Sequence, residues 1–142
     1  LPDDASALVG ITDDDLFASG LNFVFGIGSF SERTGVYSLR RLKTEDNVLF
    51  LRRSLKLMNH EVGHLFSMRH CIFYRCTMNG SNSLAESDNQ PVHLCPIDIR
   101  KLQWNTGFEV GEWYGKLRDF YRKVGMEEEA RWTAARLGGK RP

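Results

Sequence analysis

The sequence lacks the features that mark membrane-spanning and nucleic-acid-binding proteins. No apolar run approaches the roughly 20 residues that a transmembrane helix requires. The 19 Lys and Arg residues nearly balance the 18 Asp and Glu residues, and the net charge of +1 offers no electrostatic basis for binding nucleic acid or an anionic membrane. There is also no internal repeat and no low-complexity tract. We therefore expect no nucleic-acid partner and no membrane association.

Cysteine is equally scarce, with only Cys71, Cys76 and Cys95 in the chain. An odd number of cysteines fits a disulfide framework poorly. Three thiols near a group of histidines fit metal ligation in a reducing compartment better. We therefore expect a cytoplasmic protein, with the nucleus as a second candidate compartment. The chain does not start with Met, so the lack of a signal peptide adds little to this expectation.

The composition favours one globular domain. With 142 residues, of which 42% are hydrophobic, the chain can bury a core of its own. We therefore expect a single domain over residues 1–142. The sequence leaves the oligomeric state open, with a monomer as the default.

Hydrophobic patterning predicts a small sheet followed by helices. Aromatic and β-branched runs bounded by turn residues predict strands over residues 7–12, 21–28 and 36–42. Thr12 and the three acids after it offer a helix start. A polar, turn-rich loop is expected over residues 71–95. Helices are predicted over residues 44–67, 95–107, 108–124 and 126–137. The basic tail GGKRP is expected to be a solvated chain end.

The helix over residues 44–67, with Thr44 as its candidate cap, carries the most informative pattern. Its apolar residues recur at spacings of 4, 3, 4 and 3 and form one stripe: Leu51, Leu55, Met58, Val62 and Leu65. At about 100° per residue, His60 and His64 lie on the face opposite this stripe. A histidine buried in the core would lie on the stripe instead. The pattern therefore directs both histidines toward an open cleft.

The stretch HEVGHLFSMRHC, residues 60–71, contains the groups that a catalytic metal site needs. His60 and His64 are spaced i, i+4 and can hold one Zn²⁺ at about 2.0–2.1 Å each. Glu61 can flank the metal without ligating it, which suits a general base that takes a proton from water. His70 adds a third imidazole, and three histidines with an open fourth position are typical of catalytic zinc sites. A bare H-E-x-x-H is a weak signal, and the alternative is three surface histidines with no metal.

His70 can join the other two histidines only if the helix ends and the chain turns sharply near Ser67. Glycine adopts positive φ freely at such a turn. Serine there predicts a strained or reshaped turn, at a cost on the order of 1 kcal/mol. Structural zinc binding in zinc-finger peptides contributes about 10–16 kcal/mol, so the serine does not exclude a metal site.

This stretch, followed by CTMNG (76–80) and CPID (95–98), resembles the archaemetzincins, a family of metzincin zinc peptidases. That family carries H-E-x-x-H-x-x-G-x-x-H-C-x4-C-x-M and then C-x-x-C. LNFVFG before the motif and KLQW after it are similar to the same family, and the resemblance covers residues 8–115.

The resemblance implies an α+β fold, a metzincin-like zincin catalytic domain. A small twisted mixed sheet would pack on the active-site helix, and the C-terminal part would be helical. Residues 1–70 would supply the sheet and the active-site helix, and residues 71–142 the Met-turn, the structural zinc loop and the C-terminal helices. The N-terminal strand and helix of the family's domain are expected to be missing upstream of Leu1.

The resemblance also implies the roles of the site residues. His60, His64 and His70 would hold a catalytic zinc, with Glu61 as the general base. Met78 would form a turn beneath this site, packing rather than ligating. A second, structural zinc would use Cys71, Cys76, Cys95 and Asp98, for a total of two Zn²⁺ per chain.

Asp98 stands where the family has its fourth cysteine. A carboxylate can bind Zn²⁺ at about 2.0–2.2 Å and keeps the charge of the ligand set. Its hard oxygen should weaken the preference for zinc relative to sulfur. His93 is a competing fourth ligand, and water or no second metal is the remaining alternative.

These features predict a zinc-dependent peptidase that hydrolyses peptide bonds with metal-activated water and Glu61 as general base. The substrate is expected to be a peptide along the edge of the sheet, beside residues 36–42. The alternative is a catalytically inactive, zinc-stabilised binding module of the same fold, which the changes at Ser67 and Asp98 keep open. A zinc-ribbon-like nucleic-acid module is a third hypothesis, which the near-neutral charge supports little. The physiological substrate, and the choice between internal and N-terminal cleavage, stay open.

Overall fold

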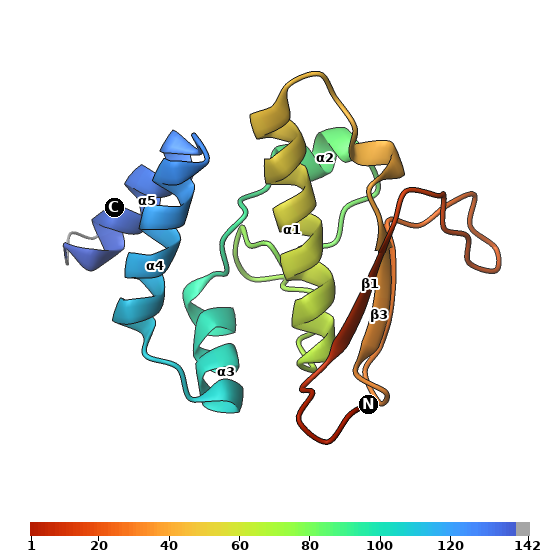
Figure 1. Ribbon diagram of the computed structural model, residues 1–142, viewed down its shortest axis with the longest axis horizontal. Helices are drawn as coiled ribbons and strands as arrows, with labels where there is room; N and C mark the ends of the chain where they lie inside the picture. Colours follow the sequence, from red (N-terminus) through yellow and green to blue (C-terminus); the bar gives the residue numbers. More distant parts are fainter. Residues whose placement is uncertain (139–142) are drawn as a thin grey trace. The chain divides into compact units, whose positions relative to one another are not determined.

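The chain divides into two compact units, Leu1–Lys101 and Leu102–Pro142. The computed structural model describes residues 1–138 (Figure 1). The expectation of a solvated tail falls on residues 139–142, which lie outside the described residues. The single domain expected over residues 1–142 stays a prediction.

The first unit contains a three-stranded mixed sheet with β3 at its centre. Strands β1 (Leu8–Thr12), β2 (Gly26–Ser29) and β3 (Thr34–Ser38) lie in the order β1-β3-β2. β1 pairs with β3 in parallel, with Leu8 opposite Thr34, and β2 pairs with β3 antiparallel. The predicted α+β class with a small mixed sheet is therefore confirmed.

Two predicted strands differ from the observed ones. Within residues 21–25, Val24 forms only an isolated bridge to Leu16, and regular pairing starts at Gly26. The strand predicted over residues 36–42 ends at Ser38, where the side chain competes with the ladder. Ser38 Oγ donates to the carbonyl of Asp14 at 2.6 Å and accepts from the amide of Arg40 at 3.1 Å. The chain then forms the 3₁₀ helix η1 (Arg40–Leu42).

The substrate position expected beside residues 36–42 is wrong. This segment contains the end of β3, which is paired on both sides, with β1 on one side and β2 on the other. Only β1 and β2 are edge strands of this sheet.

The helix start expected at Thr12 is also wrong. Thr12 ends β1, and its Oγ1 accepts a hydrogen bond from the amide of Asp14 at 3.1 Å. The neighbouring acids pair with cations near η1 instead of a helix N-terminus. Asp13 lies 2.6 Å from Lys43, and Asp15 lies 2.7 Å from Arg41.

Helix α1 (Asn47–Leu65) carries the histidines and packs against β2 and β3 (Figure 1). Its cap is Asp46 rather than the predicted Thr44, because the Asp46 carboxylate accepts from the amides of Val48 and Leu49 at 2.9 and 3.0 Å. Thr44 instead accepts from the amide of Asp46. The helix was therefore predicted correctly, with its start three residues too early.

The apolar stripe of α1 is only partly buried. Leu65 is buried and packs against Gly28 and Gly35 of the sheet. The other members of the stripe are half-buried: Leu51, Leu55, Met58 and Val62. Lys56 and Glu61 are buried although they lie off the stripe. The histidine face of α1 is thus partly covered rather than fully open.

The loop predicted after α1 is held against that helix. It contains one short helix that sequence reasoning missed, α2 (Leu84–Asp88). Arg53 of α1 binds the carboxylate of Asp88, with Nη2 2.6 Å from Oδ2, and Lys56 donates to Ser87 Oγ at 2.8 Å. Side chains of α1 therefore anchor the loop.

Helix α3 (Pro96–Thr106) begins in the first unit and ends in the second. In the second unit, α4 (Val110–Lys123) and α5 (Glu127–Leu137) pack against each other. Their junction turns at Gly125, where φ is +77°. The helical C-terminal part is confirmed, with ends within a few residues of those predicted. Among residues 1–138, no helix is both long and apolar enough to cross a bilayer.

Candidate active site and metal centres

Three histidine side chains converge beside α1. His60 and His64 lie one turn apart on this helix, and their Nε2 atoms are 3.0 Å apart. His70 follows the helix, and its ring centroid lies 5.1 Å from that of His60 and 5.0 Å from that of His64. One nitrogen of each imidazole lies within 4.8 Å of the other two. The structure therefore brings together the three histidines that the sequence singled out.

The turn at Ser67 makes this convergence possible. Ser67 has a φ of +63°, in the left-handed region that favours glycine. Its amide donates to the carbonyl of His64 at 2.8 Å, and the amide of Met68 donates to the carbonyl of Gly63 at 3.0 Å. Such bonds close a helix C-terminus. The strained turn predicted from the serine is confirmed, and it returns the chain toward α1 before His70.

Backbone carbonyls orient two of the imidazoles. Nδ1 of His60 lies 2.9 Å from the carbonyl oxygen of Thr77, and Nδ1 of His64 lies 2.7 Å from that of Met68. A carbonyl only accepts hydrogen bonds, so each Nδ1 carries the proton and each Nε2 keeps a lone pair. Two lone pairs then face each other across 3.0 Å, an arrangement that a shared cation resolves. This observation fits a metal bound at Nε2.

Burial keeps these two histidines neutral. Desolvation lowers the pKa of His60 to about 4 and holds the pKa of His64 below its ordinary value. The neutral imidazole is the form that binds a metal. At neutral pH the pair can therefore accept a cation such as Zn²⁺ without first losing a proton.

Glu61 lies beside these two histidines and is more deeply buried than they are. Its side chain packs against Gly26 of β2, so closely that a Cβ on Gly26 would fall 2.6 Å from Glu61 Oε1. Burial raises the pKa of Glu61 to about 7. A carboxyl group with such a pKa can gain and lose a proton near neutral pH, as a general base must.

A cleft of about 490 Å³ opens beside these residues. It is bordered by residues 21–26, by α1 and by the loop that contains α2, and it reaches His60, Glu61 and His70. A second hollow shares these three residues and is lined by Gly26 and Gly28 of β2. The histidines therefore face space that runs along the edge strand β2.

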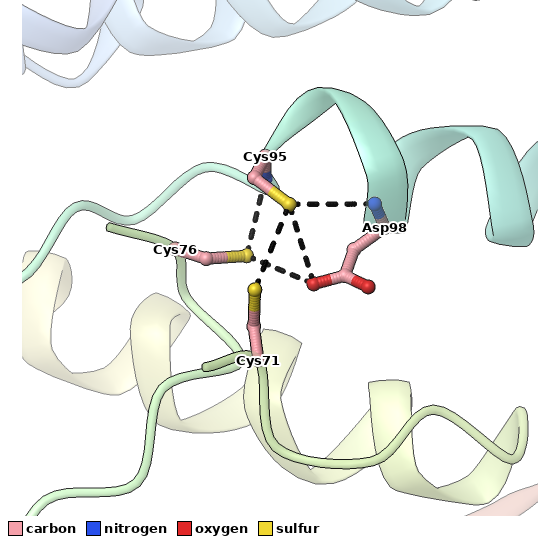
Figure 2. Close-up of side chains that lie close together, drawn as sticks. All are labelled: Cys71, Cys76, Cys95 and Asp98. Carbon is pink, nitrogen blue, oxygen red and sulfur yellow. Dashed lines mark hydrogen bonds between the residues drawn. The ribbon is translucent and has the colours of Figure 1, made fainter. Parts of the chain in front are cut away.

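A second group of possible metal ligands is buried between the loop and the start of α3 (Figure 2). The sulfur atoms of Cys71, Cys76 and Cys95 and one oxygen of Asp98 lie within 4.8 Å of one another. Asp98 Oδ2 is 3.3 Å from Cys76 Sγ and 3.4 Å from Cys95 Sγ. The sulfurs of Cys71 and Cys95 are 3.9 Å apart. The structure places Asp98 with the cysteines and His93 outside the group.

The donor chemistry of this group fits zinc. The amide of Cys95 donates to Cys76 Sγ at 3.1 Å, and the amide of Asp98 donates to Cys95 Sγ at 3.4 Å. Burial raises the pKa of the Cys76 and Cys95 thiols, so a bound cation is needed to hold them as thiolates. Burial also acts to raise the pKa of Asp98, but hydrogen bonds from Lys101 and the two thiols outweigh it and leave that pKa below its usual value. Sulfur and carboxylate oxygen are both zinc ligands.

Met78 and Asn79 connect the two groups. Met78 is fully buried under α1 at Gly63, and its carbonyl accepts from the amide of Cys71 at 2.9 Å. Asn79 Oδ1 accepts from the amide of Cys76 at 2.8 Å, while Nδ2 donates to the carbonyl of Cys71 at 2.7 Å. The segment that carries His70 and Cys71 is therefore fixed to the loop that carries Cys76.

Sequence reasoning missed the residues that support these groups. They contact a ligand or Glu61 without being ligands themselves: Gly26, Met68, Thr77, Asn79 and Lys101. Only Lys101 left a signal in the sequence, because it follows Asp98 by three positions on a predicted helix. The other four act through backbone groups or contact residues elsewhere in the sequence, and no local sequence pattern indicates such contacts.

Comparison with known proteins places the chain in a family. The family model described as Peptidase family M54 matches residues 5–104. Archaemetzincin-2 of Macaca fascicularis is 37% identical in an alignment of 148 positions, and the alignment covers 82% of this chain and 41% of the relative. Archaemetzincin of Thermococcus kodakarensis is 41% identical in an alignment of 107 positions, and the alignment covers 71% of this chain and 58% of the relative. The chain thus spans between two fifths and three fifths of the length of these relatives.

A solved structure gives the same result for the fold. The crystal structure of archaemetzincin from Methanopyrus kandleri matches with a TM-score of 0.69 at 37% identity, covering 76% of this chain and 60% of that one. The family match extends over α1, both groups of possible ligands and most of α3. On these grounds the chain belongs to peptidase family M54, the archaemetzincins.

Proposed function

We propose that this chain is the catalytic part of a zinc-dependent peptidase in which His60, His64 and His70 bind the catalytic zinc. The observation that carries the proposal is the convergence of three imidazoles beside a buried carboxyl group at a cleft. Membership of a peptidase family supports it. Zinc bound there would supply a Lewis acid that polarises a peptide carbonyl and acidifies water.

Glu61 acts as the general base in this proposal. Its carboxylate accepts a proton from the attacking water and then gives that proton to the amine that leaves. A pKa raised by burial to about 7 suits both transfers. Gly26 holds the carboxyl group in place, because their close contact leaves the side chain little room to move.

The substrate is a peptide in extended conformation that pairs with β2. β2 is the edge strand nearest the histidines, and its glycines line the hollow that meets His60. Pairing with an edge strand gives main-chain affinity with little dependence on sequence. The adjoining cleft of about 490 Å³ would accommodate a side chain of the bound peptide.

The group formed by Cys71, Cys76, Cys95 and Asp98 holds a second zinc with a structural role. Its four side chains are all buried and leave no exposed position for a substrate. Met78 packs beneath the first site without ligating. We therefore expect two zinc ions per chain.

The test compares the wild-type chain with Glu61→Gln. Elemental analysis should find about two zinc ions per chain in both, because Glu61 is not a ligand. Cleavage of a peptide library should be sensitive to a chelator and should fall by about 10²–10⁴-fold in Glu61→Gln. Glu112→Gln, at an exposed site on α4, serves as the matched control and should cleave like the wild type.

Two results would contradict the proposal. Full hydrolysis by zinc-loaded Glu61→Gln would exclude Glu61 as the general base. A wild-type chain that binds both zinc ions but cleaves no peptide in the library would favour the inactive binding module instead.

A further inference from the structure

The two oxygens of Asp98 have different partners. Oδ2 points at the sulfurs, 3.3 Å from that of Cys76 and 3.4 Å from that of Cys95 (Figure 2). Oδ1 points away from them and accepts a hydrogen bond from Nζ of Lys101 at 2.8 Å. Asp98 itself is fully buried, with 0% of its surface exposed.

The two oxygens need different partners because an aspartate at a cysteine position brings one oxygen more than the metal site requires. A thiolate offers one ligand atom, whereas a carboxylate offers two oxygens. In a closed four-coordinate site the second oxygen needs another partner, because a buried charged oxygen without one is unfavourable. Without a partner it would also compete for the metal and raise the coordination number. Lys101 supplies that partner from one turn further along α3.

We propose that Lys101 is a positioning residue that holds Asp98 as a single-oxygen ligand. Together with Cys71, Cys76 and Cys95, Asp98 then makes a four-coordinate site for a divalent cation that prefers sulfur. This inference rests on the second metal site proposed above.

The charges of the group support this role. Three thiolates and one carboxylate carry four negative charges, two more than a divalent cation neutralises. The ammonium of Lys101 is hydrogen-bonded to Asp98 and offsets one of these two excess negative charges. Its side chain is 56% exposed, so the charge stays hydrated while its tip reaches the buried carboxylate. Outer partners of this kind raise metal affinity about 10–100-fold in other proteins.

The alternative is an ordinary helix salt bridge that stabilises α3 and does nothing for the metal. A pair of this kind exists at Lys116 and Glu112, 2.7 Å apart on α4. The two interpretations differ in one respect. A salt bridge that only stabilises α3 should leave the zinc affinity and the coordination number of the folded chain unchanged, whereas a role in holding the second oxygen requires Asp98 and changes both.

The test is therefore a double-mutant cycle on the full chain, with affinity for the second zinc measured by competition with a chelator. Lys101→Met should lower this affinity about 10–100-fold, whereas Lys101→Arg should keep it within about threefold of the wild type. In the Asp98→Cys background, Lys101→Met should change the affinity less than about threefold, since a thiolate has no second oxygen. Lys116→Met is the control and should match the wild type.

Cobalt substitution gives a second measurement that does not depend on activity. Four-coordinate Co²⁺ has intense visible d–d bands that weaken when a fifth ligand binds. The wild type and Lys101→Arg should share the intense spectrum, and Lys101→Met should lose intensity. Circular dichroism confirms that each variant remains folded.

The possible results separate the two proposals. An unchanged affinity and spectrum in Lys101→Met would overturn the role of Lys101 while leaving the second zinc in place. An equal loss in the wild-type and Asp98→Cys backgrounds would also overturn it, because the lysine would then act independently of the second carboxylate oxygen. A wild-type chain that binds only one zinc would overturn the second metal site itself, and this inference with it.

Discussion

Gly63 of α1 and Met78 of the following loop touch directly. A Cβ atom on Gly63 would lie 2.4 Å from the sulfur of Met78 and 2.9 Å from its terminal methyl group. The terminal methyl group of Met68 would lie 3.0 Å from the same Cβ, and both methionines are buried, so an added Cβ would meet two packed side chains. The helix that carries two of the histidines thus rests on the residue between the two groups of possible metal ligands.

Gly63→Ala should therefore destabilise the protein. Overpacking of a full core costs about 1–3 kcal/mol, which outweighs the gain of about 0.5–1 kcal/mol from replacing a helical glycine. Gly115→Ala on α4 is the matched control, because a Cβ there has nothing within 4 Å and should stabilise the helix. Urea unfolding of the metal-loaded chains measures the free energy of unfolding of each variant relative to the wild type. A Gly63→Ala variant as stable as the wild type would show that Met78 can move.

Gly26→Ala should impair hydrolysis without removing zinc. A Cβ at this position would lie 2.4 Å from Cδ of Glu61 and must displace the carboxyl group. Misplacing a catalytic group by about 1 Å can cost on the order of 10²-fold in rate, so we expect a loss of about 10–100-fold in kcat/KM. Gly10→Ala in β1, where the nearest atom is at 3.5 Å, is the control. Normal hydrolysis by Gly26→Ala would show that the reaction does not depend on the position that the Glu61 carboxyl group has in this structure.

Local patterns predicted the parts of this protein that depend on short spacings. The helix over α1 and the shared face of His60 and His64 both follow from a period of 3.6 residues, and the positive φ of Ser67 follows from the need to end that helix. The true cap, Asp46, lies two residues from the predicted Thr44, because either side chain can cap a helix.

Sheet order and side-chain partners could not be predicted in the same way. Nothing local reveals that β3 is central, since that depends on pairing with two distant segments. The contacts of Gly26 with Glu61 and of Lys56 with Ser87 likewise join residues more than 30 positions apart. Residues 21–25 have the composition of a strand, yet they border the cleft and precede the regular pairing of β2, which begins at Gly26.

Substitutions at Ser67 should rank in stability by their tolerance of positive φ. Ser67 is exposed, so replacing it changes little buried surface. Ser67→Gly should gain up to about 1 kcal/mol, and Ser67→Val should lose about 1–2 kcal/mol, because a β-branched residue tolerates the left-handed region poorly. Thermal unfolding with zinc bound measures the series. If Ser67→Val matched the wild type, the turn would have to relax to negative φ.

Lys56 should make stability rise with pH in the alkaline range. Burial lowers the pKa of Lys56 from 10.5 to about 8, while its ammonium donates to Ser87 Oγ at 2.8 Å and Gln90 Oε1 at 2.9 Å. Below pH 8 the lysine is charged in both the folded and the unfolded chain. Between pH 8 and 10.5 the unfolded chain holds more protons, so the free energy of unfolding should rise, by about 3 kcal/mol across this window.

The difference between the wild type and Lys56→Met isolates this effect, because other titrating groups contribute equally to both. The free energy of unfolding of the wild type minus that of Lys56→Met should increase from pH 8 to pH 10.5 in urea titrations of the metal-loaded chains. Lys116→Met controls for the loss of an exposed lysine. A difference that stays flat or falls with pH would show that the buried ammonium is fully compensated by the oxygens of Ser87 and Gln90.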